Sequence, residues 1–475
     1  MTIGELPDDV LLAIFDFHVV KYQELYHIVF TGLDTKSKIE SWQSLVHVCR
    51  RWRCLVFGSP RRLNLQLCCT TRTTTRTAAR KSFDIWPALP LLIRGNVSET
   101  SVDNVIAELE HSDRICLINL FFRTTPGIEK LWTAMQVPFP ELAILCLTFG
   151  GLPYVPVLPD SFPIGSAPNL KFLALSFMPF PRIPKLLSST THLVVLWLVN
   201  IPHSGYISPE AMATCLSMLT KLQTLRLTFE SPQSSPDQEN QLSPLPTRYI
   251  IPALSSFWFK GVNEYLENLL SRIDAPQIYR DKFSTTFFND IEFDTPELNK
   301  FISRTPRLGA YNEVLLIFKK SEALVRLQSH HEPSHHGLIE VKILCRVFDW
   351  QLSSLAQICT LSLHPLLTMK DLYIYEDPNS PPDWKDDIET GEWFDLLLPF
   401  TTVKNLHLSK QFVPRIVPAL QELTEGRTTE VLPTLRNLFL ERFQASVPVY
   451  EGIRKFVSAR QLINHPVALS VWERD

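Results

Sequence analysis

The clearest pattern in the chain is a short apolar run of the form Leu-x-x-Leu-x-Leu, which recurs from about residue 85 onward. Apolar residues at alternate positions over a short run indicate a strand with one buried face. Successive clear runs begin 23 to 32 residues apart, with helical spacing between them, as in 208–220 and 264–273. The clear runs are Ile115/Ile118/Leu120, Leu142/Leu145/Leu147, Leu170/Leu173/Leu175, Leu193/Leu196/Leu198, Leu222/Leu225/Leu227 and Leu254/Phe257/Phe259, and the weaker ones are Leu372/Ile374, Leu406/Leu408 and Leu435/Leu438/Leu440.

One strand with one helix is too small to bury its own apolar face, so such units stack and share a continuous core. A period of roughly 20–29 residues with one strand per unit is typical of leucine-rich repeats. The fold we predict is therefore α/β, with an irregular leucine-rich-repeat-like solenoid of parallel strands and helices over residues 85–475. The alternative is a generic α/β domain with several parallel strands.

The repeats depart from the leucine-rich pattern just after each strand. That pattern has Asn or Cys there, whereas this chain has Gly150, Met178, Ile201 and Glu230. Without those side chains we expect no ladder of hydrogen bonds between neighbouring repeats. The variable spacing of the repeats also predicts an uneven curve.

Two apolar segments near the N-terminus have helical spacing. The first opens with Leu6-Pro7-Asp8-Asp9, in which proline suits the first helical turn and the carboxylates lie where the helix dipole favours negative charge. The second segment, around residues 45–53, has its apolar positions at i, i+3, i+4 and i+7, which predicts one helix. The apolar faces are Val10, Leu11, Ile14 and Phe15 in the first segment, and Leu45, Val48, Cys49 and Trp52 in the second.

Leu6-Pro7, the helix from Leu11 to Phe15, and Val48-Cys49-Arg50-Arg51-Trp52 resemble, in this order, the F-box, a module of three helices. The resemblance covers about the first 58 residues. The interval from Phe15 to Leu45 is longer than in the family, and we interpret residues 19–41 as an inserted or extended second helix. An ordinary helical hairpin with its own core is the alternative.

Three later stretches, residues 293–306, 384–386 and 456–461, resemble a large fungal family of the basidiomycete type. Its members combine an N-terminal F-box with degenerate leucine-rich repeats. This resemblance spans most of the chain and implies an architecture without implying a substrate.

A basic stretch follows the predicted F-box, since nine basic residues and no acidic ones lie between Arg50 and Lys81. We interpret residues 59–84 as a linker with a Thr/Arg-rich loop, and the charge as a solvated face or a patch for an acidic partner. Aromatic residues do not alternate with the loop arginines, so a nucleic-acid partner is not expected.

Three insertions interrupt the predicted repeats. Residues 231–247 contain four prolines and predict a disordered loop, and residues 328–337 form a His-rich turn. Residues 376–393 hold seven acidic residues together with Trp384 and Trp393. These tryptophans either anchor a partner or fold back onto the repeats, and we favour the second interpretation.

Composition limits the class of protein. The net charge is −3, the nine cysteines are scattered without a C-x-x-C pair, and only 15 residues are glycine. Scattered cysteines suggest reduced thiols, so we expect an intracellular protein, cytoplasmic or nuclear. No apolar stretch approaches eighteen uncharged residues, so no membrane span is expected. The acidic N-terminus does not resemble a signal peptide.

Only one motif suggests metal chemistry. His331-Glu332-Pro333-Ser334-His335 matches the H-E-x-x-H pattern of zinc peptidases, but Pro333 interrupts the helix that the motif requires. We therefore predict a polar surface loop, with adventitious metal binding and a catalytic zinc site as alternatives. G-x-S-x-G, G-x-G-x-x-G and P-loop motifs are absent from the sequence. We expect a non-catalytic protein with no cofactor and no metal site.

The F-box resemblance implies docking on the Skp adaptor of a cullin-RING ubiquitin ligase, with the repeat region binding an unknown target protein. A scaffold outside any ligase is the alternative. The adaptor-binding residues that the resemblance implies are Leu6, Pro7, Val10, Leu11, Ile14, Phe15, Leu45, Val48, Cys49 and Trp52. The concave strand positions that could face a target are Cys146, Ala174, Trp197, Arg226 and Trp258, among which we select Trp197, Arg226 and Trp258.

Overall fold

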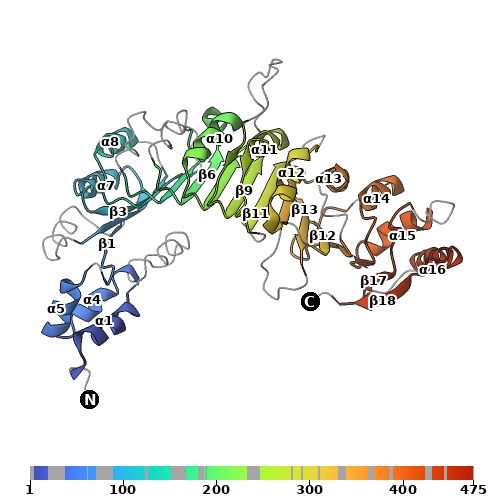
Figure 1. Cartoon of the computed structure of the whole chain (residues 1–475), viewed down its shortest axis with the longest axis horizontal. Helices are drawn as coiled ribbons and strands as arrows, with labels where there is room; N and C mark the ends of the chain where they lie inside the picture. The colour runs from blue at the N-terminus through green and yellow to red at the C-terminus, as the bar shows by residue number, and fades with distance from the viewer. Residues whose placement is uncertain are drawn as a thin grey trace. The chain divides into compact units, whose positions relative to one another are not determined.

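The chain divides into two compact units, Met1–Tyr206 and Ile207–Asp475, which we call unit 1 and unit 2. Figure 1 shows the computed structural model with the elements of both units labelled. The structure describes residues 5–19, 38–60, 62–70, 89–123, 127–150, 167–179, 187, 190–232, 247–279, 282–289, 293–308, 311–329, 339–361, 369–384, 389–422, 430–442 and 447–473.

Unit 1 has helices at its start and then strands that alternate with helices. Its strands pair in parallel and in chain order from β1 to β6. The elements are α1 (Asp8–Asp16), α4 (Trp42–Val46), α5 (Arg50–Gly58), β1 (Leu67–Thr70), β2 (Leu91–Val97), α7 (Val102–Leu109), β3 (Ile115–Phe122), α8 (Ile128–Ala134), β4 (Ile144–Phe149), β5 (Phe172–Ser176) and β6 (Val195–Ile201), followed by the short 3₁₀ turn η3 (His203–Gly205). Strand β1 lies inside the stretch interpreted as a linker, so the sheet begins before residue 85.

Unit 2 repeats the alternation of strands and helices. Its main sheet has the order β7-β9-β11-β14-β13-β12-β15-β16-β17-β18. The elements are α10 (Pro209–Met218), β7 (Thr224–Phe229), β8 (Tyr249–Ile250), β9 (Ser256–Gly261), α11 (Asn263–Leu270), β10 (Ile273–Asp274), β11 (Phe283–Phe288), α12 (Pro296–Arg304), η5 (Pro306–Leu308), β12 (Glu313–Phe318), β13 (Ala323–Gln328), β14 (Ile339–Leu344), α13 (Phe348–Leu361), β15 (Asp371–Glu376), α14 (Thr390–Leu397), β16 (Asn405–Leu408), α15 (Val413–Glu422), β17 (Asn437–Glu441), α16 (Val447–Leu462) and β18 (Ala468–Trp472).

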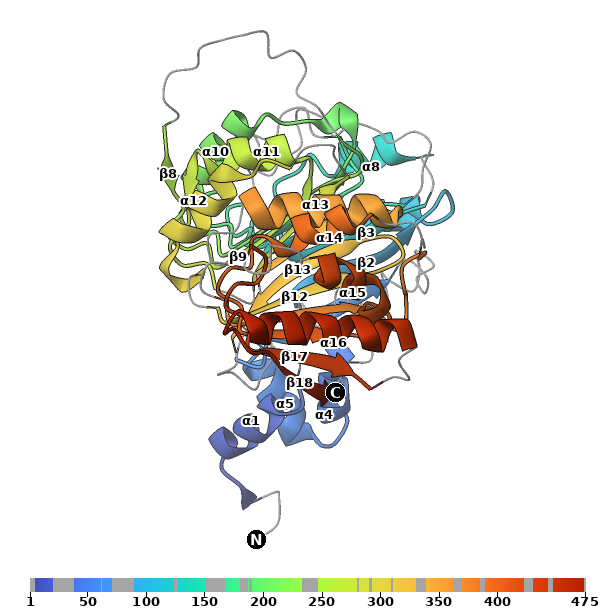
Figure 2. The same cartoon turned by 90° about the vertical axis from the view of Figure 1, so that its right-hand side faces the viewer.

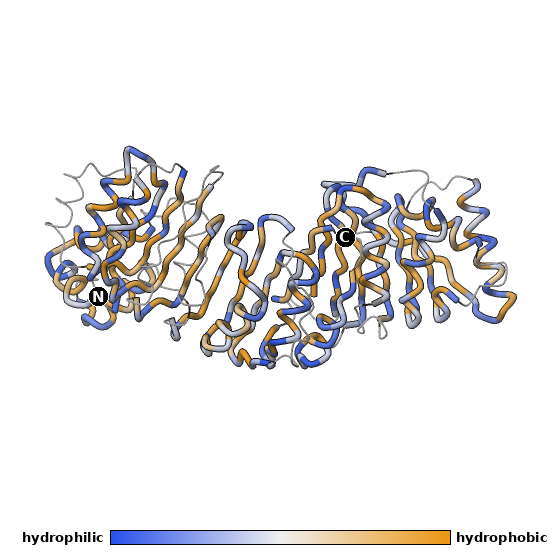
Figure 3. The backbone as a smooth tube through the Cα atoms, turned by 90° about the horizontal axis from the view of Figure 1, so that it is seen from above, coloured by the Kyte–Doolittle hydropathy of each residue, from blue (hydrophilic) through white to orange (hydrophobic). Residues whose placement is uncertain are grey.

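The predicted apolar runs all coincide with strands, from β3 to β7 and in β9, β15, β16 and β17. The last two apolar positions of each run face the helices and are buried, as Leu372, Ile374, Leu406 and Leu408 illustrate. In Figure 3 the tube has the hydrophobic colour along much of the sheet. Burying a side chain of this size contributes about 1.5–3 kcal/mol, so the shared core explains why the repeats stack. The predicted mixed α/β fold of parallel strands and helices is confirmed.

One part of unit 2 departs from the all-parallel prediction. Strand β13 pairs antiparallel with both β12 and β14, whereas β12 pairs in parallel with β15, and β11 pairs in parallel with β14. The turn between β12 and β13 spans only residues 319–322, too short for the crossover that a parallel connection needs. The expectation of exclusively parallel strands is therefore wrong here.

The sheet of unit 1 is apolar on both faces. Besides the side that faces the helices, a second cluster of buried side chains includes Leu117, Cys146, Phe172 and Ala174, and Ile39, which precedes α4, joins it. Sheets covered on both faces carry nearly continuous apolar strands, as Ile144–Phe149 does here. Cys146 and Ala174 are thus buried, and the idea that they face a target protein is wrong.

Gly150 stands where leucine-rich repeats have Asn or Cys, and packing explains the glycine. A Cβ atom at this position would clash with the ring of Phe121 on β3. The space that an asparagine would need is occupied by an aromatic ring of the preceding repeat.

The two tryptophans of the acidic insertion fold back onto unit 2, as the favoured interpretation predicts. Trp393 lies on α14 and is buried, with its ring at right angles to that of Phe412, centroid to centroid 5.8 Å. Trp384 is half-buried, packs edge-on against Phe348 and Phe412, and has the Arg415 guanidinium 4.0 Å from its ring centroid.

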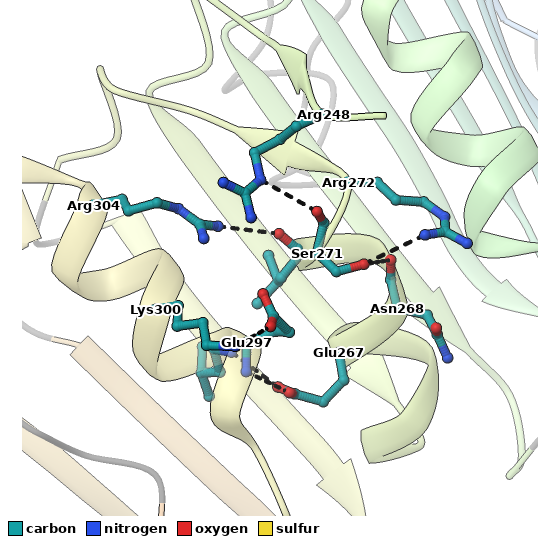
Figure 4. A network of polar contacts seen from close by, with 10 residues as sticks. Arg248, Glu267, Asn268, Ser271, Arg272, Glu297, Lys300 and Arg304 are labelled. Atoms are coloured by element: carbon teal, nitrogen blue, oxygen red, sulfur yellow. Dashed lines mark hydrogen bonds and ion pairs between the residues drawn. The ribbon is translucent and has the colours of Figure 1, made fainter. Parts of the chain in front are cut away.

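A carboxylate from one helix caps the next helix in unit 2 (Figure 4). Glu267 on α11 accepts hydrogen bonds from the backbone N–H of Glu297, at 2.6 Å, and of Leu298, at 2.9 Å. These N–H groups belong to the first turn of α12, where intrahelical acceptors are lacking. Thr295, at the N-cap position of α12, makes no side-chain cap, so Glu267 supplies the missing acceptor from the neighbouring repeat.

We predict that Glu267 makes unit 2 less stable as the pH rises. Burial, opposed by the two N–H donors and assisted by the charges of Glu297 and Asp294, raises the pKa of Glu267 to about 7. The folded state therefore binds this proton more tightly than the unfolded chain, so the stabilisation is complete below about pH 4.5 and is lost as the pH rises through 7. With allowance for partial exposure, the loss by pH 8 is about 2 kcal/mol.

Urea unfolding at a series of pH values measures this effect. Glu267→Gln should remove the decline between pH 5 and 8, whereas Glu264→Gln, at an exposed position of the same helix, should retain it. Equal pH profiles for the wild type and Glu267→Gln would contradict the prediction.

Candidate protein-binding surfaces

Helix α1 forms as the sequence predicts, but it buries only part of the predicted apolar face, together with one residue outside that face. Pro7 occupies the N-cap position, and Asp8 and Asp9 lie in the first turn. The buried residues are Leu11, Leu12 and Phe15. Sequence reasoning missed Leu12, because an apolar stripe does not by itself show which of its edges is covered.

The second apolar segment is not one helix, which corrects the prediction for residues 45–53. Helix α4 ends at Val46 and α5 begins at Arg50, with Cys49 between them in an extended conformation (φ −158°, ψ 171°). The Cys49 sulfur accepts a hydrogen bond from the Trp52 backbone N–H at 3.5 Å, so Cys49 caps α5. Arg53 Nε donates to the carbonyl of Val46 at 3.0 Å and satisfies the end of α4.

Side-chain contacts tie α1 to α5. The Phe15 and Trp52 rings lie 4.7 Å apart, centroid to centroid. The Arg51 guanidinium donates to the carbonyl of Leu6 at 2.6 Å and to the Asp8 carboxylate at 2.5 Å. The segment before α1 is therefore held against α5 by an exposed ion pair and a backbone contact.

The ten predicted adaptor-binding residues fall into three classes of exposure. Some are part of the internal packing of the helices, and only the exposed ones are available to a partner. Leu11, Phe15 and Leu45 are buried, Leu6 and Trp52 are half-buried, and Pro7, Val10, Ile14, Val48 and Cys49 are exposed. The structure thus removes the three buried residues from any docking surface.

An exposed apolar stripe remains on α1 and the turn after it. Val10, Ile14 and Phe17 follow one another at i, i+4 and i+7, on one side of the helix, and Phe17 is 91% exposed. Val48, in the turn between α4 and α5, is 59% exposed. We call Val10, Ile14 and Phe17 the N-terminal apolar surface. Phe17 was missed in the sequence, although its spacing from Val10 is the signal that would have identified it.

The three predicted target-binding residues lie on strands of both units. Trp197 lies on β6 in unit 1, is half-buried and packs edge-on against Phe172. Arg226 on β7 and Trp258 on β9 are direct neighbours across two parallel strands of unit 2. Arg226 is exposed and Trp258 half-buried, so these two are placed together on a sheet face.

That face continues across unit 2 on the side of the sheet away from the helices, which we call the open face (Figures 1 and 2). Strand register aligns one residue of each strand in a single row. The row is Arg226, Trp258, Ser284, Glu340, Arg326, Leu315, Tyr373, His407, Phe439 and Ser470.

The row has a charged part and an aromatic part. Arg326 forms an ion pair with Glu340 at 2.8 Å, and the Lys342 ammonium also contacts Glu340 at 2.8 Å, so these two cations lower the pKa of Glu340 despite its burial. Further along, the His407 ring stacks between Tyr373 and Phe439, at 4.1 and 4.3 Å.

Next to the aromatic stack runs a ladder of amide hydrogen bonds, which corrects the expectation that no ladder joins the repeats. Asn405 Nδ2 donates to the Asp371 carboxylate at 2.5 Å, and Asn437 Nδ2 donates to Asn405 Oδ1 at 2.7 Å. Burial, together with the nearby Glu313 and Asp371 charges, raises the pKa of Tyr373. The ladder residues are the first residues of β15, β16 and β17. The expectation was based on the position just after each strand, where leucine-rich repeats have Asn or Cys, and it therefore did not include them.

Among the residues that the structure describes, no group of three or more His, Cys, Asp or Glu side chains could hold a metal ion. The His331–His335 motif lies between β13 and β14, outside the described residues. No described helix is long and apolar enough to cross a membrane.

Comparison with known proteins adds little to this picture. No protein-family model matches the chain, and no curated protein does. Among solved structures, the leucine-rich repeat-containing protein LegL7 from Legionella pneumophila is similar at 10% identity over 82% of this chain and 97% of its own, with a TM-score of 0.25. The backbones do not superpose closely at that score, so the architecture above is based on this chain's own strand pairing.

Proposed function

We propose that this protein is the substrate-recognition subunit of an Skp–cullin–F-box type ubiquitin ligase. The resemblance of residues 6–15 and 48–52 to the F-box supports this proposal. The observation that carries it is the N-terminal apolar surface, because a small helical module that leaves Phe17 and its neighbours uncovered is suited to docking on another protein. The protein would act inside the cell, in the cytoplasm or nucleus.

In this proposal the chain performs no chemistry itself. Residues 1–58 would hold the Skp adaptor, and the repeat region would hold a target protein near the ubiquitin-conjugating enzyme. Tethering raises the effective concentration of the two reactants. Arg226 and Trp258 on the open face, together with Trp197 in unit 1, are the residues we propose for target binding, and neither a cofactor nor a metal is required.

Exposed positions allow docking to be tested separately from folding. We predict that Ile14→Ser with Phe17→Ser weakens capture of the purified Skp adaptor at least tenfold, because the apolar contacts are lost. Substitutions at exposed positions should change stability by only about 0.5 kcal/mol. Binding is measured by calorimetry or pull-down with the full chain.

The matched control is Ile250→Ser, an exposed apolar residue in unit 2, which should bind the adaptor like the wild type. Leu11→Ala is unsuitable as a docking test because Leu11 is buried and its truncation would disturb folding. Undiminished capture by the folded double variant, or no capture by the wild type, would overturn the proposal.

The second candidate function is a scaffold outside any ligase, and it predicts adaptor binding without a cullin. Co-purification of a cullin with the wild-type chain, lost in the double variant, supports the ligase. An adaptor complex that never contains a cullin supports the scaffold.

A further inference from the structure

The last strand of unit 2 leaves its apolar side uncovered. In β18, Leu469 is aligned with Leu438 of β17, and Val471 with Leu440. The two β17 residues are 0% and 8% exposed, whereas Leu469 and Val471 are 47% and 67% exposed. The apolar rows that the other strands bury beneath the helices therefore continue to β18, the edge strand of the sheet (Figure 2), and are exposed there.

The backbone of β18 is open along the same edge. Ala468 N donates to the carbonyl of Arg436, which directs the even-numbered residues toward β17. In a parallel pair the alternate residues point their N–H and C=O groups to the other side, so those of Leu469 and Val471 face outward. Within the described residues, β18 pairs with β17 alone.

Natural sheets protect such edges with charged residues, proline or bulges. The stretch Ala468–Trp472 contains none of these, and Ser470 is its only polar residue. An edge of this kind is suited to addition of another strand.

We propose that the partner is β18 of a second copy of this chain, paired antiparallel about a two-fold axis at Ser470. The outward-facing backbone groups make this register possible. Leu469 of one copy and Val471 of the other would exchange both backbone hydrogen bonds, and symmetry repeats the exchange.

The side chains fit the same register. On the apolar side, Leu469 of each copy lies against Val471 of the other copy. Each copy thereby covers apolar side chains of the other. On the open face the large Trp472 lies opposite the small Ala468, while Ser470 faces its own copy. Glu473 falls opposite Val467, so no like charges oppose one another in the paired segment. This self-complementarity favours a second copy over an unrelated strand.

The interface is small, because five residues from each copy contribute far less than a standard interface of about 800 Å² per partner. We therefore expect a weak dimer in reversible equilibrium with the monomer. Light scattering coupled to size exclusion, and sedimentation velocity, with the full chain at roughly 1–100 μM, measure the equilibrium.

The test variants are Leu469→Lys and Val471→Lys, since both residues are exposed and a lysine there places like charges together in the dimer. Each lysine variant should weaken association at least tenfold, whereas the conservative variant Val471→Ile should dimerise like the wild type. Ile250→Lys, at a similarly exposed position on β8, should dimerise like the wild type.

A wild-type chain that stays monomeric throughout this range overturns the proposal. So does a dimer that persists unchanged in Leu469→Lys and Val471→Lys.

Discussion

Replacing Trp393 with alanine should lower the free energy of unfolding of unit 2 by about 3–5 kcal/mol, the range for truncating a fully buried aromatic residue. Trp393 is 1% exposed, and its ring contacts those of Phe412 and Phe348. The Phe318 and Trp384 rings complete this cluster between α13, α14 and α15. Alanine would leave a cavity that three helices and a strand would have to close.

Trp384→Ala is the matched comparison, because this ring belongs to the same cluster but is only half-buried. Trp384→Ala should lower the free energy of unfolding by less than Trp393→Ala does. The loss should come mainly from the contacts of Trp384 with Phe348 and Phe412 and with the Arg415 guanidinium above its ring. Urea unfolding gives the midpoints, and hydrogen exchange shows whether α13 to α15 lose protection. A larger loss for Trp384→Ala than for Trp393→Ala would contradict this account of the cluster.

The strands that were predictable are those with leucines at the repeated positions, because burial against the helices requires those residues. Strands β11 to β14 escaped the pattern for identifiable reasons. Phe283, Thr285 and Phe287 alternate inward on β11 with a threonine where a leucine was sought. Strand β12, Glu313–Phe318, is buried along its whole length and therefore shows no alternation.

The N-terminal surface was predictable in composition but not in exposure. Apolar spacing placed Val10, Leu11, Ile14 and Phe15 together, yet the packing of α5 covers only part of that stripe. The break before α5 gave no signal, because residues 45–53 contain neither proline nor glycine. A cysteine sulfur that caps the second helix is a tertiary detail that periodicity does not encode.

The ladder on the open face could have been predicted from the sequence. Asp371, Asn405 and Asn437 each stand immediately before the first inward leucine of their strands. Because register aligns those leucines, the preceding polar residues must also align. A search for a repeated polar residue on either side of each strand would have found them.

Arg460 should be the most sensitive charged residue of unit 2, and Arg460→Met is expected to lower its stability by about 3 kcal/mol or more. The side chain of Arg460 is 0% exposed on α16. Its Nη2 donates to the carbonyls of Leu432 and Pro433 at 3.2 Å and of Leu435 at 3.3 Å. Methionine fills much of the volume but donates nothing, so these acceptors lose a charged donor, and each buried polar group left without a partner costs about 1–3 kcal/mol.

The three carbonyls form the turn that leads into β17. We therefore expect the substitution to loosen this turn first and to lower the stability of unit 2 as a whole through it. Hydrogen exchange at residues 432–441 should rise in Arg460→Met, and the urea midpoint should fall. Arg454→Met is the control, since Arg454 is exposed on the same helix and its loss should be nearly neutral. Burial lowers the pKa of Arg460, but a guanidinium stays charged at any ordinary pH, so the difference between the two variants should persist from pH 5 to 8. If Arg460→Met is as stable as Arg454→Met, the buried guanidinium does not hold the turn, and α16 is fixed by its apolar face alone.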